Sequence, residues 1–108
     1  MLVGNGEYAG VRVLEGKTID EMFRARPVPG GNKRALSWDA RSGFSSNRGQ
    51  GMSDSAVGHG GFTGTVIWID PELNLFYIVL SNRVHPDGKG GVNKLGGEIG
   101  TVVVQSKL

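Results

Sequence analysis

Cysteine is absent from this 108-residue chain. Without a thiol, the chain can form no disulfide, no thiolate nucleophile and no cysteine-based metal site. His59 and His85 are the only histidines, and no carboxylate spacing completes a metal site around them. We therefore predict no bound metal and no cofactor.

Strong charge of one sign is also missing, because 12 Lys and Arg residues stand against 10 Asp and Glu residues. The resulting net charge of +2 is too small to favour a nucleic-acid partner or an anionic membrane surface. No apolar run approaches the roughly 20 residues that a membrane span requires, and no segment resembles a signal peptide. The chain as given is expected to be soluble, with no nucleic-acid partner and no membrane span, and its localisation stays open.

Glycine is the abundant residue, with 19 copies that gather in turn-like clusters and show no three-residue period. That distribution excludes a collagen-like chain. The hydrophobic fraction of 38% and the charged fraction of 20% are typical of a folded chain rather than a disordered one. A length of 108 residues suits one small domain or a fragment of a larger one.

The first third of the chain predicts a short strand and a short helix. Val11–Val13 alternates like a strand. A helix is expected from Lys17 to Arg24, where Thr18 and Glu21 have the spacing of a capping box. Proline and glycine between residues 27 and 32 end that helix.

The middle of the chain carries the strongest strand pattern. Ala35–Trp38 could form a strand, and Ser42–Ser55, rich in Gly and Ser, is predicted to be an exposed loop. Thr65–Ile69 and Leu75–Leu80 are apolar and β-rich, and residues 70–74 between them suit a hairpin connection. Neither strand alternates cleanly, so we expect both to be covered on both faces. The chain offers few helices for that purpose, which suggests that partner structure is missing.

The C-terminal tail favours a helix, because four apolar residues fall on one helical face: Leu95, Ile99, Val102 and Val103. Three glycines in this segment weaken the prediction by up to about 1 kcal/mol each, and a strand over 102–104 stays open as the alternative. The predicted fold class is α+β, an antiparallel sheet with a short helix and a C-terminal helix.

The segment with the most chemical potential is Gly58–Thr65, which runs directly into the first strand of the hairpin. Its small residues would let a backbone or a ligand approach a strand edge. His59 could act as an acid, a base or a hydrogen-bond donor near neutral pH. On spacing alone, the favoured interpretation is structural, with glycines at a bulge and a hydrogen-bonded histidine. A phosphate loop is disfavoured, because the segment opens a strand and not a helix.

The string His59-Gly60-Gly61-Phe62-Thr63-Gly64-Thr65, followed by residues 68–71, resembles the third signature region of β-lactamase-related serine hydrolases. In that family a Lys-Thr-Gly or His-Thr-Gly lies on a strand that lines the active site. The pair Asn82-Arg83, the segment 6–14 with the helix ending near Met22, and the Leu-x-Trp of residues 36–38 also resemble family features. The likeness runs in order over most of the chain and implies a partial β-lactamase-like fold.

The resemblance implies roles for four positions. His59 stands where the family has Lys or His and would orient substrate or tune the proton relay. Gly60 replaces the usual Thr or Ser, so the hydroxyl that contacts a substrate carboxylate is lost, which leans toward esterase-like members. Gly61 keeps the family's glycine and leaves room for substrate. The backbone N–H of Phe62 would be one of two oxyanion-hole donors.

The family's nucleophile is missing, because no Ser is followed by Lys three positions later. No Tyr-x-Asn occurs, and Ser45-Ser46-Asn47, which fits the alternative Ser-x-Asn pattern, is interpreted as a chance match in a loop. We expect residues 1–108 to be the incomplete C-terminal segment of a β-lactamase-like domain, inactive alone and able to take a small acyl substrate only when completed. The alternative is a non-catalytic binding or assembly module, with self-association through unpaired sheet edges. Family members are often periplasmic or exported.

Overall fold

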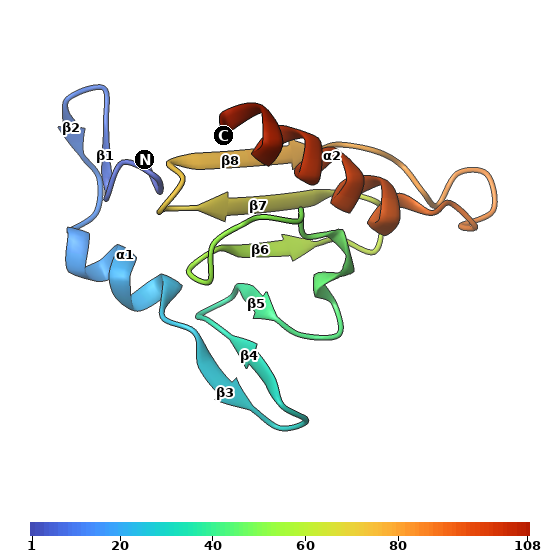
Figure 1. The fold of residues 1–108 in the computed structure, drawn as a ribbon, viewed down its shortest axis with the longest axis horizontal. Helices are drawn as coiled ribbons and strands as arrows, with labels where there is room; N and C mark the ends of the chain where they lie inside the picture. The colour runs from blue at the N-terminus through green and yellow to red at the C-terminus, as the bar shows by residue number, and fades with distance from the viewer.

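Six antiparallel strands form the main sheet of the protein, and the computed structural model describes all residues, 1–108. Neighbouring strands follow chain order: β3 (Arg26–Val28), β4 (Asn32–Arg34), β5 (Asp39–Arg41), β6 (Val57–Gly60), β7 (Val66–Asp70) and β8 (Leu75–Val79). A separate two-stranded hairpin, β1 (Glu7–Tyr8) and β2 (Val11–Arg12), precedes helix α1 (Gly16–Phe23). A 3₁₀ turn, η1 (Ser45–Asn47), and a C-terminal helix, α2 (Val92–Lys107), complete the chain (Figure 1). The predicted α+β class is confirmed.

The β7–β8 hairpin is the best-formed part of the sheet, as the sequence predicted. Its register places Trp68 opposite Tyr77 and Val66 opposite Val79. These four side chains share one face of the sheet, because side chains alternate across a strand. We call this the inner face.

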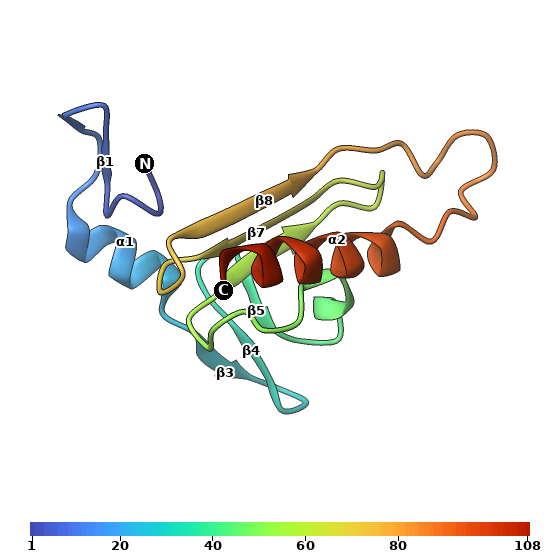
Figure 2. The same cartoon turned by 45° about the horizontal axis from the view of Figure 1, so that its top comes forward.

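Helix α2 lies across the inner face (Figure 2), so the predicted C-terminal helix is confirmed over its strand alternative. The core beneath it holds six buried side chains: Met52, Ala56, Val66, Trp68, Tyr77 and Val104. Two of the glycines that weakened the helix prediction lie where the helix contacts the sheet. A Cβ on Gly96 would lie 3.3 Å from Val66 Cγ2, and one on Gly100 would lie 2.3 Å from Tyr77 Oη. Glycine lets the helix approach the sheet closely, which offsets its low helix propensity.

The expectation that both hairpin strands are covered on both faces is right for β7 and wrong for β8. On the outer face, Ile69 is buried, while Phe76 and Ile78 remain 55% and 52% exposed. The N-terminal residues 1–3 reach this face and enclose a hollow of about 240 Å³ with Ile67, Ile69, Phe76 and Ile78. Strand β8 is exposed because it lies at the edge of the sheet and the only helix packed on it covers the inner face.

The two edges of the sheet differ in chemistry. Edge strand β3 carries Pro27, which cannot donate a backbone hydrogen bond, and the charged Arg26. Proline and charge on an edge discourage pairing with further strands. Edge strand β8 reads Leu-Phe-Tyr-Ile-Val and has neither. The sheet is therefore closed to extension on the β3 side and open on the β8 side.

Helix α1 forms where predicted, but its capping box does not. Glu15 is the N-cap residue, and no side chain caps the helix. Glu21 instead forms ion pairs with Arg24 and Arg26, which draws its carboxylate away from the helix N-terminus. Ile19 is the buried residue of the helix.

Two predictions for the middle of the chain need correction. Residues 35–38 form no strand; strands β4 and β5 flank them, because Ser37 adopts a left-handed φ of 61° that interrupts extended backbone. Residues 42–55 are largely loop, yet they are not uniformly exposed, since Asn47 and Met52 are buried against the inner face.

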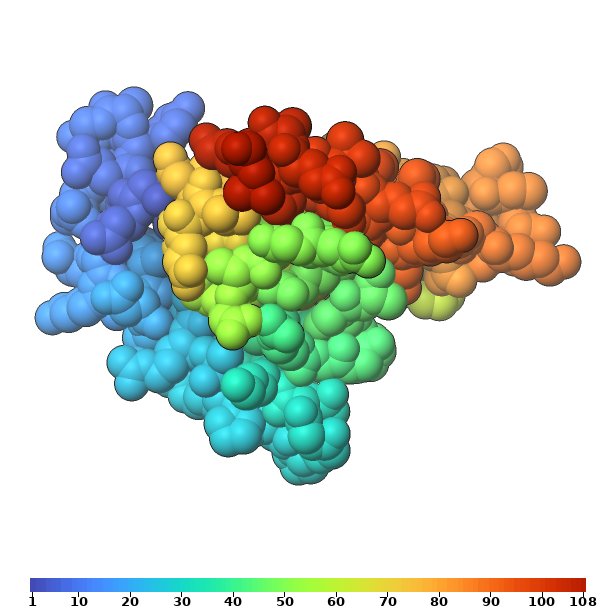
Figure 3. All heavy atoms as spheres, in the orientation of Figure 1, coloured from blue at the N-terminus to red at the C-terminus, as the bar shows by residue number.

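The surface of the molecule has one prominent projection. In the space-filling view the loop of residues 83–91 (orange) extends from the body of the protein (Figure 3). This loop joins β8 to α2.

Neither helix is long and apolar enough to cross a membrane.

Candidate active site at the end of strand β6

A tight turn joins β6 to β7 and shapes the candidate site. Gly61 N–H donates to Thr65 O at 2.7 Å, and Gly64 N–H donates to Gly61 O at 3.0 Å. Gly64 has a φ of 109°, a conformation that L side chains rarely adopt. A Cβ on Gly61 would lie 2.5 Å from Thr65 Oγ1. The glycines at these two positions are therefore required by the turn itself.

Strand β6 has a free backbone edge beside this turn. Strand β5 pairs with it at Asp39 and Gly58 alone, while β7 pairs with it from Val57 to Gly60. The backbone of Gly60, which faces the β5 side, therefore pairs with no strand, and its carbonyl oxygen instead lies 2.8 Å from His59 Nδ1. Backbone groups on such an edge can hydrogen-bond an extended ligand.

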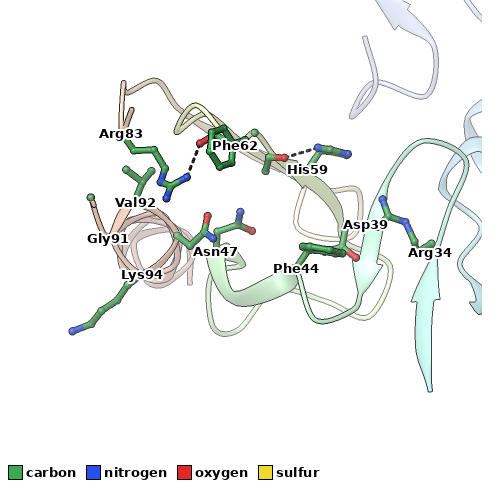
Figure 4. Close-up of a pocket in the computed structure, with 14 residues that line it drawn as sticks. Arg34, Asp39, Phe44, Asn47, His59, Phe62, Arg83, Gly91, Val92 and Lys94 are labelled. Atoms are coloured by element: carbon green, nitrogen blue, oxygen red, sulfur yellow. Dashed lines mark hydrogen bonds between the residues drawn. The ribbon is translucent and has the colours of Figure 1, made fainter. Parts of the chain in front are cut away.

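The free edge opens into a pocket of about 560 Å³ (Figure 4). The four residues singled out in the sequence, His59, Gly60, Gly61 and Phe62, all line it. The remaining wall comes from segments far apart in the chain: Arg34, Asp39, Phe44, Asn47, Arg83 and the residues 90–94 that open α2. The structure thus brings the predicted site residues together at one cavity.

His59 is exposed, and its ring is oriented by its own strand. Nδ1 lies 2.8 Å from Gly60 O, and because a carbonyl oxygen only accepts, Nδ1 carries the proton in this contact. In the neutral ring, Nε2 is then left with a free lone pair. Successive side chains alternate, so His59 lies on the outer face beside Ile67, its partner in the register.

The peptide group of Phe62 is held from one side and free on the other. Its carbonyl accepts a hydrogen bond from Arg83 Nη1 at 3.0 Å, while its N–H takes part in none of the hydrogen bonds that close the turn. The Phe62 ring is 77% exposed, and the Arg83 guanidinium lies 4.8 Å from its centroid. The free N–H is a donor available to a ligand.

Asn82 and Arg83 tie the end of the sheet to the following loop. Arg83 Nη2 donates to Gly88 O at 2.8 Å, and Asn82 Oδ1 accepts from His85 N–H at 3.3 Å. Arg83 also faces the pocket (Figure 4). It therefore stiffens both the loop and the Phe62 turn.

The pocket carries more positive than negative side chains. Arg34, Arg83 and Lys94 line it against a single carboxylate, Asp39. The first turn of α2 carries no acidic residue, so the positive end of the helix dipole adds to this bias. Asp39 is buried, with Oδ2 accepting from Ser45 Oγ at 2.8 Å and Oδ1 without a partner. No cluster of three or more His, Cys, Asp or Glu side chains has the geometry to hold a metal ion.

Asn47 is the pocket residue that the sequence did not identify. It ends η1, is 1% exposed and reaches the pocket beside the start of α2 (Figure 4). Trp68 Nε1–H donates to its Oδ1 at 2.9 Å, and Tyr77 Oη–H donates to its backbone oxygen at 2.8 Å. The Ser-x-Asn pattern was the available signal, but a Ser- and Gly-rich loop produces such matches by chance.

Tyr77 is a structural group rather than a proton-transfer group. Its hydroxyl donates to Asn47 O at 2.8 Å and accepts from Gly49 N–H at 3.0 Å. Burial raises the pKa of Tyr77 to about 12, so the phenol stays neutral at physiological pH. Its two hydrogen bonds hold η1 against the sheet.

The raised pKa makes stability depend on alkaline pH. The pKa of Tyr77 in the folded protein exceeds its value of about 10 in the unfolded chain. The neutral phenol therefore stabilises the fold fully below pH ~10, and this stabilisation is lost as the pH rises through about 12. Tyr77→Phe is expected to lower the free energy of unfolding at pH 8 by about 1–3 kcal/mol. The deficit should narrow by about 1 kcal/mol between pH 9 and pH 11, since only the wild type loses stability there. Urea unfolding at each pH measures both; a deficit that stays constant with pH would contradict the assignment.

Comparison with known proteins identifies the class to which this fold and site belong. The model of the Beta-lactamase family matches residues 7–97, a span that includes the predicted site and all six strands of the main sheet. The chain belongs to the β-lactamase family.

Two curated relatives match the same share of the chain. A Bacillus subtilis N-acetylmuramyl-L-alanine amidase is 36% identical over 88 residues, which are 79% of this chain and 19% of the relative. A Salmonella typhi protein provisionally named D-alanyl-D-alanine carboxypeptidase is 29% identical over 87 residues, 79% of this chain and 20% of the relative. The chain spans about a fifth of the length of these relatives.

Proposed function

We propose that this chain is the C-terminal segment of the catalytic domain of a β-lactamase-type serine hydrolase and forms one wall of its active site. The observation that carries the proposal is the strand edge at Gly60, which no strand pairs with, next to the unpaired N–H of Phe62, in one pocket. Acyl transfer places negative charge on the carbonyl oxygen, and a preorganised N–H stabilises that charge. The excess of cationic groups around the pocket supports the same role.

The four predicted residues take distinct parts in this proposal. The unpaired edge at Gly60 aligns an extended acyl substrate, and Gly61 leaves room for it. Phe62 N–H binds the oxyanion. The Nε2 atom of His59 accepts or returns a proton during the relay. The position that each residue occupies in the family supports these parts, as does the pocket that all four residues line.

The nucleophile lies outside these 108 residues in this proposal. No Ser is followed by Lys three positions later, and without a nucleophile no acyl-enzyme can form. The chain alone is therefore inactive. The names of the two relatives, an amidase and a carboxypeptidase, both include alanine. We therefore propose amides of alanine as the first substrates to test, followed by β-lactams and esters.

Turnover assays test the proposal directly. The chain alone is expected to hydrolyse neither N-acetyl-D-alanyl-D-alanine, nor a chromogenic β-lactam, nor p-nitrophenyl acetate above the buffer rate. The same chain joined to the polypeptide encoded in frame upstream is expected to contain Ser-x-x-Lys and to hydrolyse at least one of them. Hydrolysis by the 108 residues alone would refute the proposal that the nucleophile lies outside them. An in-frame stop codon directly upstream would refute the catalytic role.

A second candidate function is a non-catalytic assembly module, favoured by the open edge of β8. Phe76, Ile78 and Leu80 are exposed on or beside this strand, and an apolar, uncharged edge invites pairing with a further strand. Sedimentation across protein concentrations separates the candidates. A dimer abolished by Ile78→Lys, together with no turnover in any form, favours the assembly module.

A further inference from the structure

Gly60 leaves a space that the side chain of Asn47 fills. A Cβ built on Gly60 would lie 2.5 Å from Asn47 Nδ2 and 3.7 Å from Asn47 Cγ. The amide nitrogen is thus the atom of Asn47 that approaches the strand most closely. A Thr or Ser at position 60 could not coexist with the amide in this place.

The orientation of the Asn47 amide is fixed by its partner on β7. Trp68 Nε1–H can only donate, so the atom it contacts at 2.9 Å must be the carbonyl oxygen Oδ1. Nδ2 therefore points the other way, toward Gly60. No side-chain or backbone acceptor of the chain receives a hydrogen bond from Nδ2.

The position of Asn47 is also rigid. Tyr77 holds its backbone oxygen, and α2 packs on it closely enough that a Cβ on Gly96 would lie 3.5 Å from Asn47 Cβ. The residue is 1% exposed, yet it lines the pocket. A donor that lines the pocket and has no acceptor in the chain suits a ligand oxygen that enters the pocket.

We propose that the Asn47 side-chain amide is a specificity-determining donor that binds an oxygen of the acyl substrate beside Gly60, in place of a hydroxyl at position 60. The inference rests on the proposed function, since it concerns the same pocket. The acceptor is a carboxylate or carbonyl oxygen of the substrate, because Nδ2 is an N–H donor and Arg34 and Arg83 line the same pocket. Loss of the hydroxyl at position 60 therefore leaves oxygen recognition intact.

The test uses the completed polypeptide, in which these 108 residues are joined to the sequence encoded in frame upstream, labelled with ¹⁵N, and two probes, N-acetyl-D-alanine and N-acetyl-D-alaninamide. Both offer an amide carbonyl, and only the first adds a carboxylate. Titration is expected to move the Asn47 side-chain NH₂ signals together with the Phe62 backbone N–H. A stronger response to the acid assigns the acceptor to the carboxylate, and equal responses assign it to the carbonyl.

Asn47→Asp provides the matched variant, because it keeps an acceptor for Trp68 and removes the donor. We expect it to weaken probe binding by about ten- to a hundredfold, while Ser46→Ala, on the neighbouring residue of η1, leaves binding unchanged. A carboxylate introduced at this buried position costs folding free energy, so thermal melts accompany the titration. If the variant does not fold, the shifts of the Asn47 NH₂ signals in the wild-type protein still test the proposal.

The two proposals fail in different ways. Movement of the Phe62 N–H signal without movement of the Asn47 NH₂ signals would overturn this inference and leave the proposed function standing. No movement of either group would overturn both.

Discussion

Phe62→Pro is expected to lower kcat of the completed hydrolase by about 10² to 10³. Proline has no backbone N–H, so this substitution removes the donor assigned to the oxyanion, together with the Phe62 ring. The N–H makes no hydrogen bond within the turn, so its loss leaves no acceptor of the chain unpaired. Because the oxyanion forms mainly in the transition state, KM should change far less than kcat. Steady-state kinetics on the full polypeptide gives both constants.

Phe62→Ala is the matched control for that result. It removes the exposed ring and its contact with the Arg83 guanidinium, as proline does, but it keeps the N–H. Its kcat should remain within a few fold of the wild type if the backbone group carries the effect. Equal losses in the two variants would assign the effect to the ring and remove Phe62 N–H from the oxyanion role.

Trp68→Ala should cause the largest loss of stability, about 3–5 kcal/mol in the free energy of unfolding. Trp68 is 0% exposed and lies at the centre of the core under α2. Its removal leaves a cavity and also frees Asn47 Oδ1, whose bond to Nε1 is lost. The Arg48 guanidinium, 5.7 Å from the ring centroid, loses its contact as well. Urea unfolding followed by far-UV circular dichroism measures the change.

Trp38→Ala is the internal comparison, because it deletes the same side chain at the periphery. Trp38 is half-buried and makes an edge-on contact with Phe23 at 6.0 Å. An aromatic pair of this kind contributes about 0.5–1.5 kcal/mol beyond area burial, so a smaller loss is expected. Similar losses at both tryptophans would contradict the placement of the core beneath α2.

The sequence predicted the β7–β8 hairpin and the C-terminal helix because their patterns depend on local residues. Continuous β-branched and aromatic residues define the hairpin. The apolar spacing predicted the helix correctly but the wrong face of it, because Leu95 and Val102 are exposed while Gly96, Gly100 and Val104 are buried.

The predicted capping box does not form, for a reason that the spacing of Thr18 and Glu21 does not reveal. Glu21 is drawn to Arg24 and Arg26, and Arg26 lies beyond the end of the helix.

Part of the site was predictable from the sequence, and a physical reason separates the residues that were predicted from the one that was not. His59, Gly60, Gly61 and Phe62 are contiguous, so one motif covers them, and the structure places them at one pocket. Asn47 reaches that pocket from an earlier loop, through hydrogen bonds to two aromatic residues of later strands. Its position depends on tertiary packing, which composition and periodicity do not encode. The roles assigned to these residues stay predictions until the kinetics are measured.

The glycines of α2 set a limit on how this protein can change over evolutionary time. Gly100 lies outside the pocket, yet its Cα faces the Tyr77 hydroxyl so closely that no side chain fits, and Tyr77 in turn holds Asn47. A larger residue at position 100 would displace the tyrosine, and the amide next to Gly60 would move with it. If the proposed role of Asn47 holds, a genetic screen for loss of function is expected to recover substitutions at Gly100, a helix position outside the pocket.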